Sequence, residues 1–161
     1  MPIKLEFRAE GTFIWNYGVV TGREILASNR AIYDHKFDGE FLYQIAMNSQ
    51  VEKLTAQPDD MRKLAEMDRE MIGDAAQIGI VVAESDYLFG MSRMWNQQAE
   101  TDSFHATVVR TVDEAIELLA ARGIDAGSFE YPPLPPEPDN KTVFYDHAIS
   151  DLDIGTSNSY N

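Results

Sequence analysis

The stretch Gln77-Ile-Gly-Ile-Val-Val-Ala83 decides the fold class, because this short apolar run leads almost directly into Ser85 and Asp86. The stretch Phe104-His-Ala-Thr-Val-Val-Arg110 repeats the pattern and leads into Thr111. A short apolar strand followed by a residue that can cap a helix is typical of α/β proteins. We therefore expect a strand over each run, a helix after each strand, and an α/β fold.

The first half of the chain extends the same order of elements. Apolar residues alternate with charged ones over 3–8, and residues 12–20 form a second apolar run, which together predict an opening hairpin. Thr21-Gly-Arg-Glu24 is a capping box that predicts the start of a helix. The run 41–47 predicts a strand, and Pro58 predicts the first turn of a helix. We expect a mixed sheet with helices packed against it: two strands, three helix–strand pairs and a final helix.

Composition limits the classes of partner. The chain has 161 residues, of which 44% are hydrophobic, which suits one domain with a core. Its net charge of −14 disfavours nucleic acids and anionic membranes as partners. No run is long and apolar enough to span a membrane, and the charged start Met1–Arg8 does not match a signal peptide, so we expect a cytoplasmic protein.

No complete catalytic, metal-binding or cofactor-binding motif is present. The chain has no cysteine, and its three histidines are scattered without the paired spacing of a metal site. Neither a dinucleotide-binding glycine fingerprint nor a phosphate-binding loop occurs. We therefore expect no metal, no cofactor and no enzymatic activity.

The composition changes after Gly123. Tyr131-Pro-Pro-Leu-Pro-Pro-Glu-Pro138 favours an extended polyproline-like chain. We expect a domain over 1–124, followed over 125–161 by a Pro-rich linker and an acidic C-terminal arm. The apolar residues within 139–161 favour docking of this arm on its own domain or on a second copy in a homo-oligomer.

Four stretches carry a resemblance to a known family: Tyr43-Gln-Ile-Ala-Met-Asn-Ser-Gln-Val51, Ile80-Val-Val-Ala83, Tyr87-Leu-Phe-Gly-Met-Ser-Arg-Met-Trp95 and Arg110-Thr-Val-Asp-Glu-Ala115. With the order of elements, they resemble bacterial STAS-like proteins, which have the fold of the anti-sigma-factor antagonists. The resemblance covers about residues 3–123. It implies a mixed sheet with helices against it, and a role in signalling or partner recognition rather than in turnover.

The chain departs from the antagonists at their phosphorylation loop. The corresponding stretch, Leu54-Thr-Ala-Gln-Pro-Asp-Asp60, lacks their serine and glycine. Thr55 could accept a phosphate, but Asp59 and Asp60 would repel the added charge. We favour the interpretation that Thr55 serves the entry to the helix.

The first functional hypothesis is a non-catalytic STAS-like regulatory or protein-interaction module that self-associates. One helix over 86–100 cannot bury all the Met and aromatic residues of its first half against one sheet face. We expect a partner surface that includes Phe89, Arg93, Met94 and Trp95. The alternative is that Trp95 belongs to the core and that Phe89 is peripheral.

The second hypothesis is a carrier for a small apolar, lipid-like ligand. Open α/β sheets bind ligands at the carboxyl ends of their strands. Polar residues that follow the expected strands there would orient the ligand: Asn48, Ser49, Thr55, Ser85, Asp86 and Thr111.

Overall fold

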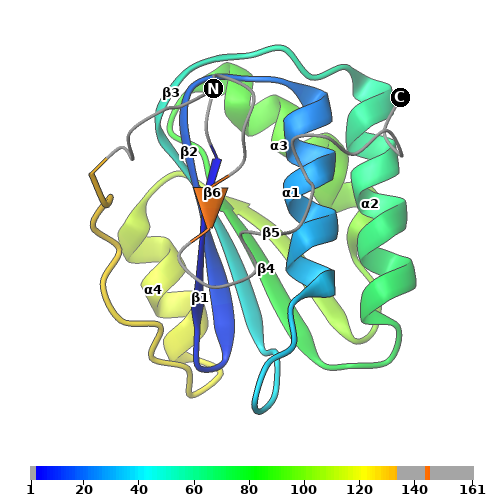
Figure 1. The fold of residues 1–161 in the computed structure, drawn as a ribbon, viewed down its shortest axis with the longest axis vertical. Coiled ribbons are helices and arrows are strands. Elements are labelled where there is room, and N and C mark those ends of the chain that lie inside the picture. Colours follow the sequence, from blue (N-terminus) through cyan, green and yellow to red (C-terminus); the bar gives the residue numbers. More distant parts are fainter. Residues whose placement is uncertain (1–2, 134–143, 146–161) are drawn as a thin grey trace.

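The computed structural model describes residues 3–133 and a short strand at 144–145. Among these residues, six strands form one mixed sheet in the order β5-β4-β3-β2-β1-β6 (Figure 1). Strands β2 to β5 are parallel, β1 is antiparallel to β2, and β6 is parallel to β1. The strands are β1 Ile3–Arg8, β2 Gly11–Val20, β3 Tyr43–Leu54, β4 Gln77–Val82, β5 Phe104–Val109 and β6 Phe144–Tyr145.

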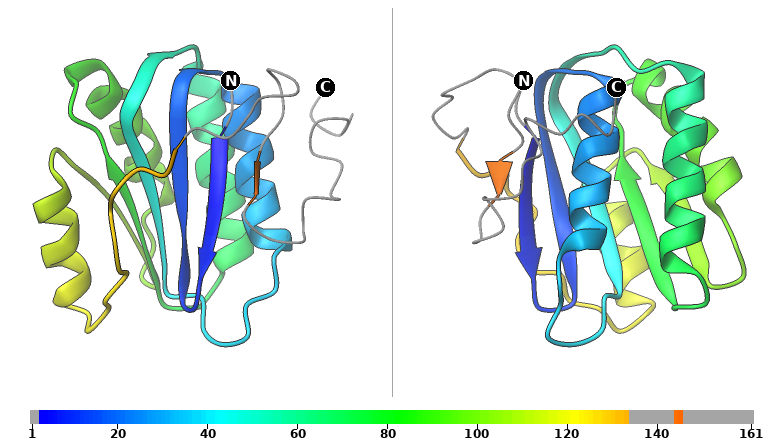
Figure 2. Two further views of the ribbon diagram at one scale, coloured as in Figure 1. Left: turned by 60° about the vertical axis from the view of Figure 1, so that its left-hand side comes forward. Right: turned by 45° about the vertical axis from the view of Figure 1, so that its right-hand side comes forward.

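The sheet lies between two layers (Figure 2). One face is covered by α1 (Gly22–Asp34), α2 (Pro58–Ile72) and α3 (Asp86–Ala99). The other face packs against α4 (Val112–Ala120) and the chain that follows it. The described part of the chain contains no helix with the length and apolar character needed to cross a membrane.

The helices begin where their sequences predict. Thr21 and Thr111 each form a complete capping box, with Glu24 and Glu114 respectively, and so satisfy the free N–H groups at the starts of α1 and α4. Ser85 Oγ accepts a hydrogen bond from the backbone N–H of Leu88 at 3.2 Å. The predicted α/β class and order of elements from β1 to α4 are confirmed.

Strand β3 is longer than the sequence predicts. Its first five residues pair with β2 and β4, but β4 ends opposite Met47. Because β2 is longer than β4, β3 continues along it, with Gln50 opposite Tyr17 and Leu54 opposite Val20. Asn48 and Ser49 therefore lie within β3 rather than after its end.

The packed domain continues past residue 124, where the sequence suggests that it ends. Ile124 and Ala126 are buried in the core, and Phe129 and Tyr131 pack against it. Arg8 anchors this segment, since its Nη1 atom donates to the carbonyl oxygen of Ala126. Residues 134–143 and 146–161, which hold most of the predicted arm, lie outside the described residues.

Candidate functional site

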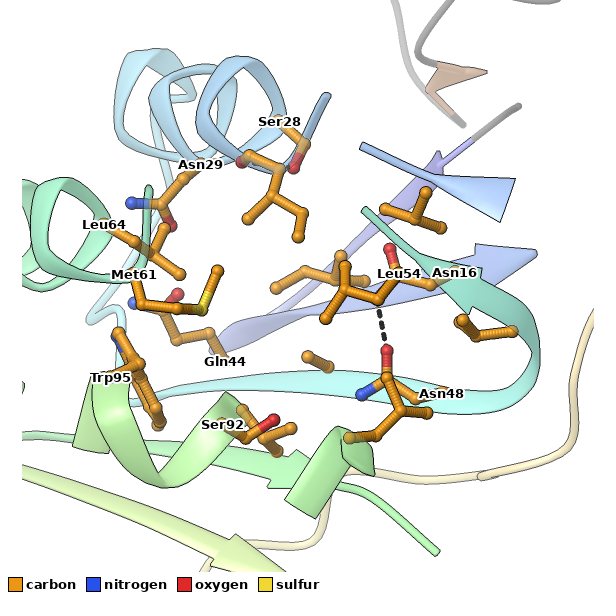
Figure 3. Close-up of a pocket in the computed structure, with 18 of the residues that line it drawn as sticks. Asn16, Ser28, Asn29, Gln44, Asn48, Leu54, Met61, Leu64, Ser92 and Trp95 are labelled. Atoms are coloured by element: carbon orange, nitrogen blue, oxygen red, sulfur yellow. Dashed lines mark hydrogen bonds between the residues drawn. The ribbon is translucent and has the colours of Figure 1, made fainter. Parts of the chain in front are cut away.

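A cavity of about 100 Å³ lies between the sheet and the layer formed by α1, α2 and α3. Most of its wall is apolar, with contributions from Ile14, Ala46, Leu64 and Leu88. Figure 3 shows that its lining side chains come from all three helices and from the central strands. Its polar lining residues are Asn16, Ser28, Asn29, Gln44, Asn48, Asp68 and Ser92.

The alternation of side chains between the two faces of β3 explains the shape of the cavity. Side chains two residues apart lie on the same face of a strand, so Gln44, Ala46 and Asn48 all face the helices. The methyl group of Ala46 leaves space between the two amides. Gly79 on β4 also lines the cavity, but the rings of Phe104 and Trp95 pack over it, because a Cβ there would lie 2.6 Å from Phe104 and 3.3 Å from Trp95. The small side chain of Ala46 therefore accounts for the space between the polar ends.

One polar end of the cavity centres on Asp68, which is fully buried on α2. Its carboxylate accepts hydrogen bonds from the Tyr33 hydroxyl at 2.6 Å, from Trp95 Nε1 at 2.7 Å and from Asn29 Nδ2 at 3.0 Å. Gln44 Nε2 donates to the Tyr33 hydroxyl at 2.9 Å and so extends the network to β3. Burial raises the pKa of Asp68, although these donors favour its ionised form.

The other polar end is a pair of amides on neighbouring strands. Asn48 Nδ2 donates to the backbone carbonyl oxygen of Val82 at 3.1 Å. Asn16 Nδ2 donates to Asn48 Oδ1 at 2.9 Å, the bond drawn as a dashed line in Figure 3. Asn16 is only 7% exposed, and its Oδ1 atom has no hydrogen-bond partner among the described residues. Asn16 therefore places a buried acceptor without a protein partner beside the cavity, and neighbouring atoms cover this oxygen almost completely.

A second hollow, of about 300 Å³, adjoins the cavity toward solvent. It lies between the last residues of β3 and the start of α3, and it shares Asn48, Val51, Leu54 and Leu88 with the cavity wall. The exposed Tyr87 spans it, donating its hydroxyl to the carbonyl oxygen of Leu54 at 3.3 Å. The shared residues show that the hollow and the cavity are neighbours.

The structure brings together three of the six residues predicted to orient a ligand. Asn48 lines both the cavity and the hollow, and Ser49 and Ser85 line the hollow.

The other three predicted residues lie outside both spaces. Thr55 Oγ1 donates to the carbonyl oxygen of Val20 at 3.4 Å, at the end of β3. Asp86 forms an exposed ion pair with Arg110 at 2.8 Å. Thr111 caps α4. Each has a structural role that its position at a helix start or strand end explains.

The predicted partner surface on α3 is smaller than expected. Trp95 is 5% exposed and donates a hydrogen bond to Asp68, so the prediction that it lies on the partner surface is wrong. Phe89 is half-buried, with the guanidinium carbon of Arg110 4.1 Å from its ring centroid. Arg93 and Met94 are exposed, Met94 by 39%.

Three important residues of the site are not predicted from the sequence: Asn16, Gln44 and Asp68. A signal for Asp68 exists, because it shares the helical spacing of the buried residues Met61, Ala65 and Ile72. A carboxylate within an apolar stripe indicates a buried polar network. Asn16 and Gln44 likewise interrupt apolar strands.

A search for metal-binding groups and three comparisons with known proteins complete the description of the site. Within the described residues, no group of three or more His, Asp or Glu side chains is arranged to hold a metal ion. Compared with models of known protein families, with curated proteins and with solved structures, the chain matches none.

Proposed function

We propose that this protein binds and carries a small, mainly apolar molecule in the cavity between the sheet and α1, α2 and α3. The observation that supports the proposal is the cavity itself, an apolar space with polar groups at both ends. Binding sites for small molecules have this composition, with few polar groups that fix the orientation of the ligand. We expect the ligand to enter through the adjoining hollow.

The volume limits the size of the ligand. An apolar cavity of ~150 Å³ holds one benzene ring, and pockets for drug-sized molecules measure ~300–1,000 Å³. At about 100 Å³, the cavity is smaller than that and suits a molecule of roughly four or five non-hydrogen atoms. The acyl chain of a lipid is too long for it, so we replace the lipid-like ligand expected from the sequence with a compact one.

Titration with furan, followed by the backbone amide signals in NMR, tests this proposal. Furan is a neutral ring of five non-hydrogen atoms. We expect saturable shifts at cavity residues such as Ala46, Gly79 and Ser92. The variant Ala46→Leu should abolish them, because the larger side chain fills the cavity, whereas Ala121→Leu, on the exposed surface, should leave them unchanged.

Two results would overturn the proposal. One is the absence of saturable shifts in the wild-type protein. The other is binding of furan to Ala46→Leu with the wild-type Kd, which would place the ligand elsewhere.

A second candidate function is a STAS-like regulatory module that binds a protein partner. The resemblance to the anti-sigma-factor antagonists supports it, as do the large exposed side chains of Tyr87 and Met94 on α3, beside Arg93. Exposed Met, Arg and aromatic side chains are favoured at interfaces. Sedimentation of the wild-type protein and of Met94→Lys tests self-association: association that the variant weakens would support the role, and a monomer in both cases would count against self-association.

A further inference from the structure

We propose that Asn16 Oδ1 makes the cavity selective for neutral ligands that donate a hydrogen bond. This inference rests on the proposed function and deepens it, since it names the chemical class of the ligand. An N–H or O–H group placed against Asn16 would satisfy a buried acceptor that has no partner among the described residues. A ligand of the same size without such a donor would leave that acceptor unsatisfied, which is unfavourable.

The orientation of the Asn16 amide follows from its neighbours. A backbone carbonyl can only accept, so Val82 requires Asn48 to present its NH2 group. Asn48 then presents Oδ1 to Asn16, which must in turn present its own NH2 group. Reversing either amide would place two oxygens against each other. The chain of donors therefore fixes Asn16 with its oxygen on the side away from Asn48.

The backbone holds this acceptor in place. The pairing of β2 and β3 shifts between Trp15 and Tyr17, so Asn16 lies at an irregularity of the sheet. On the opposite face, the Tyr131 hydroxyl lies 3.0 Å from the carbonyl oxygen of Asn16. A fixed acceptor discriminates better than a mobile one, because little freedom is lost when the ligand binds.

The surroundings favour a neutral ligand. The wall is mainly apolar, and transfer of an ion from water to such a wall is costly unless the ion is paired. At the opposite end, Asp68 already accepts hydrogen bonds from Tyr33, Trp95 and Asn29. The polar group of the ligand is therefore expected at Asn16 rather than at the carboxylate.

The test compares pyrrole with furan, two rings of the same size. Pyrrole carries an N–H donor, whereas furan carries an oxygen acceptor in its place. We expect the Kd of pyrrole in the wild-type protein to be roughly threefold to tenfold lower than that of furan, as one neutral hydrogen bond allows. The double variant Asn16→Leu/Asn48→Leu lacks this acceptor and also the Asn48 oxygen that Asn16→Leu alone would leave without its donor, so the ratio of the two Kd values should fall to about one.

Ala121→Leu is the control. Ala121 lies on the exposed surface, outside both the cavity and the hollow, so the ratio of the two Kd values in this variant should equal that of the wild-type protein. If the double variant does not fold, the wild-type and Ala121→Leu proteins still give the comparison of the two rings.

The outcomes separate this inference from the proposed function. Equal Kd values for both rings in the wild-type protein would overturn the selectivity and leave the carrier role intact. Binding of neither ring would overturn both. An ordered water that stays on Asn16 Oδ1 while pyrrole occupies the cavity would show that water, and not the ligand, is the partner of this acceptor, and would also overturn the selectivity.

Discussion

The hydroxyl oxygen of Tyr131 lies 3.0 Å from the backbone carbonyl oxygen of Asn16, whose side chain lines the cavity on the opposite face of the sheet. The same hydroxyl lies 2.6 Å from the carbonyl oxygen of Met47 and accepts from the N–H of Gln50 at 3.5 Å. These backbone groups surround the place where β2 and β3 shift register. Tyr131 thus connects the segment after α4 to the backbone that supports the proposed ligand acceptor.

Replacing Tyr131 with Phe should lower the free energy of unfolding by about 1 kcal/mol, because carbonyl groups at the register shift lose a partly buried donor. Urea denaturation measures this change. Tyr87→Phe is the control, because the Tyr87 hydroxyl makes an exposed and longer bond to Leu54, and its loss should have a much smaller effect. Equal effects of the two variants would mean that the hydroxyl of Tyr131 does not stabilise the register shift.

Replacing Asp68 with Asn should lower the free energy of unfolding by about 2–3 kcal/mol. The carboxylate accepts hydrogen bonds on both oxygens, and the amide would point an N–H group at one of the present donors. Thermal or urea unfolding measures the change, and Asp102→Asn on the exposed surface is the control. A variant as stable as the wild-type protein would contradict the proposed role of the buried network.

The stability of the wild-type protein relative to Asp68→Asn should also depend on pH. Burial raises the pKa of Asp68, so the native protein keeps this proton where the unfolded chain, with a pKa of about 3.9, releases it. The stabilising contribution is then complete below that unfolded-state pKa and is lost as the pH rises through the native pKa. Urea denaturation at several pH values should show the difference between the two proteins falling as the pH rises. A difference that grows with pH would mean that the three donors lower the pKa more than burial raises it.

Replacing Thr111 with Ala should lower the free energy of unfolding by about 1 kcal/mol, because α4 loses its capping box. Thr111→Ser, which keeps a hydroxyl, should lose much less. Because Thr111 lies outside the cavity and the hollow, the Kd of furan in NMR titrations should stay within about twofold of the wild-type value. A large rise in that Kd would mean that Thr111 contributes to ligand binding, as the sequence predicts.

The fold could be predicted because its signals are local. Thr21 with Glu24, and Thr111 with Glu114, lie three residues apart, and that spacing alone defines a capping box. The length of β3 could not be predicted in the same way, because its second half is a strand only through its pairing with β2.

The site could be predicted only in part, because its contacts join distant segments. Asn16 meets Asn48 across 32 residues and Tyr131 across 115, and an irregular strand register brings them together. Trp95 was ambiguous in the sequence. Its buried indole N–H donates to Asp68, a partner on another helix that helical spacing alone does not identify.

A crystal structure of the protein grown with pyrrole tests the central claim most directly. We expect the ring inside the cavity, beside Ala46, with its nitrogen about 2.7–3.2 Å from Asn16 Oδ1. A cavity that is empty or holds only water at a saturating pyrrole concentration would contradict the claim that this space is a ligand site.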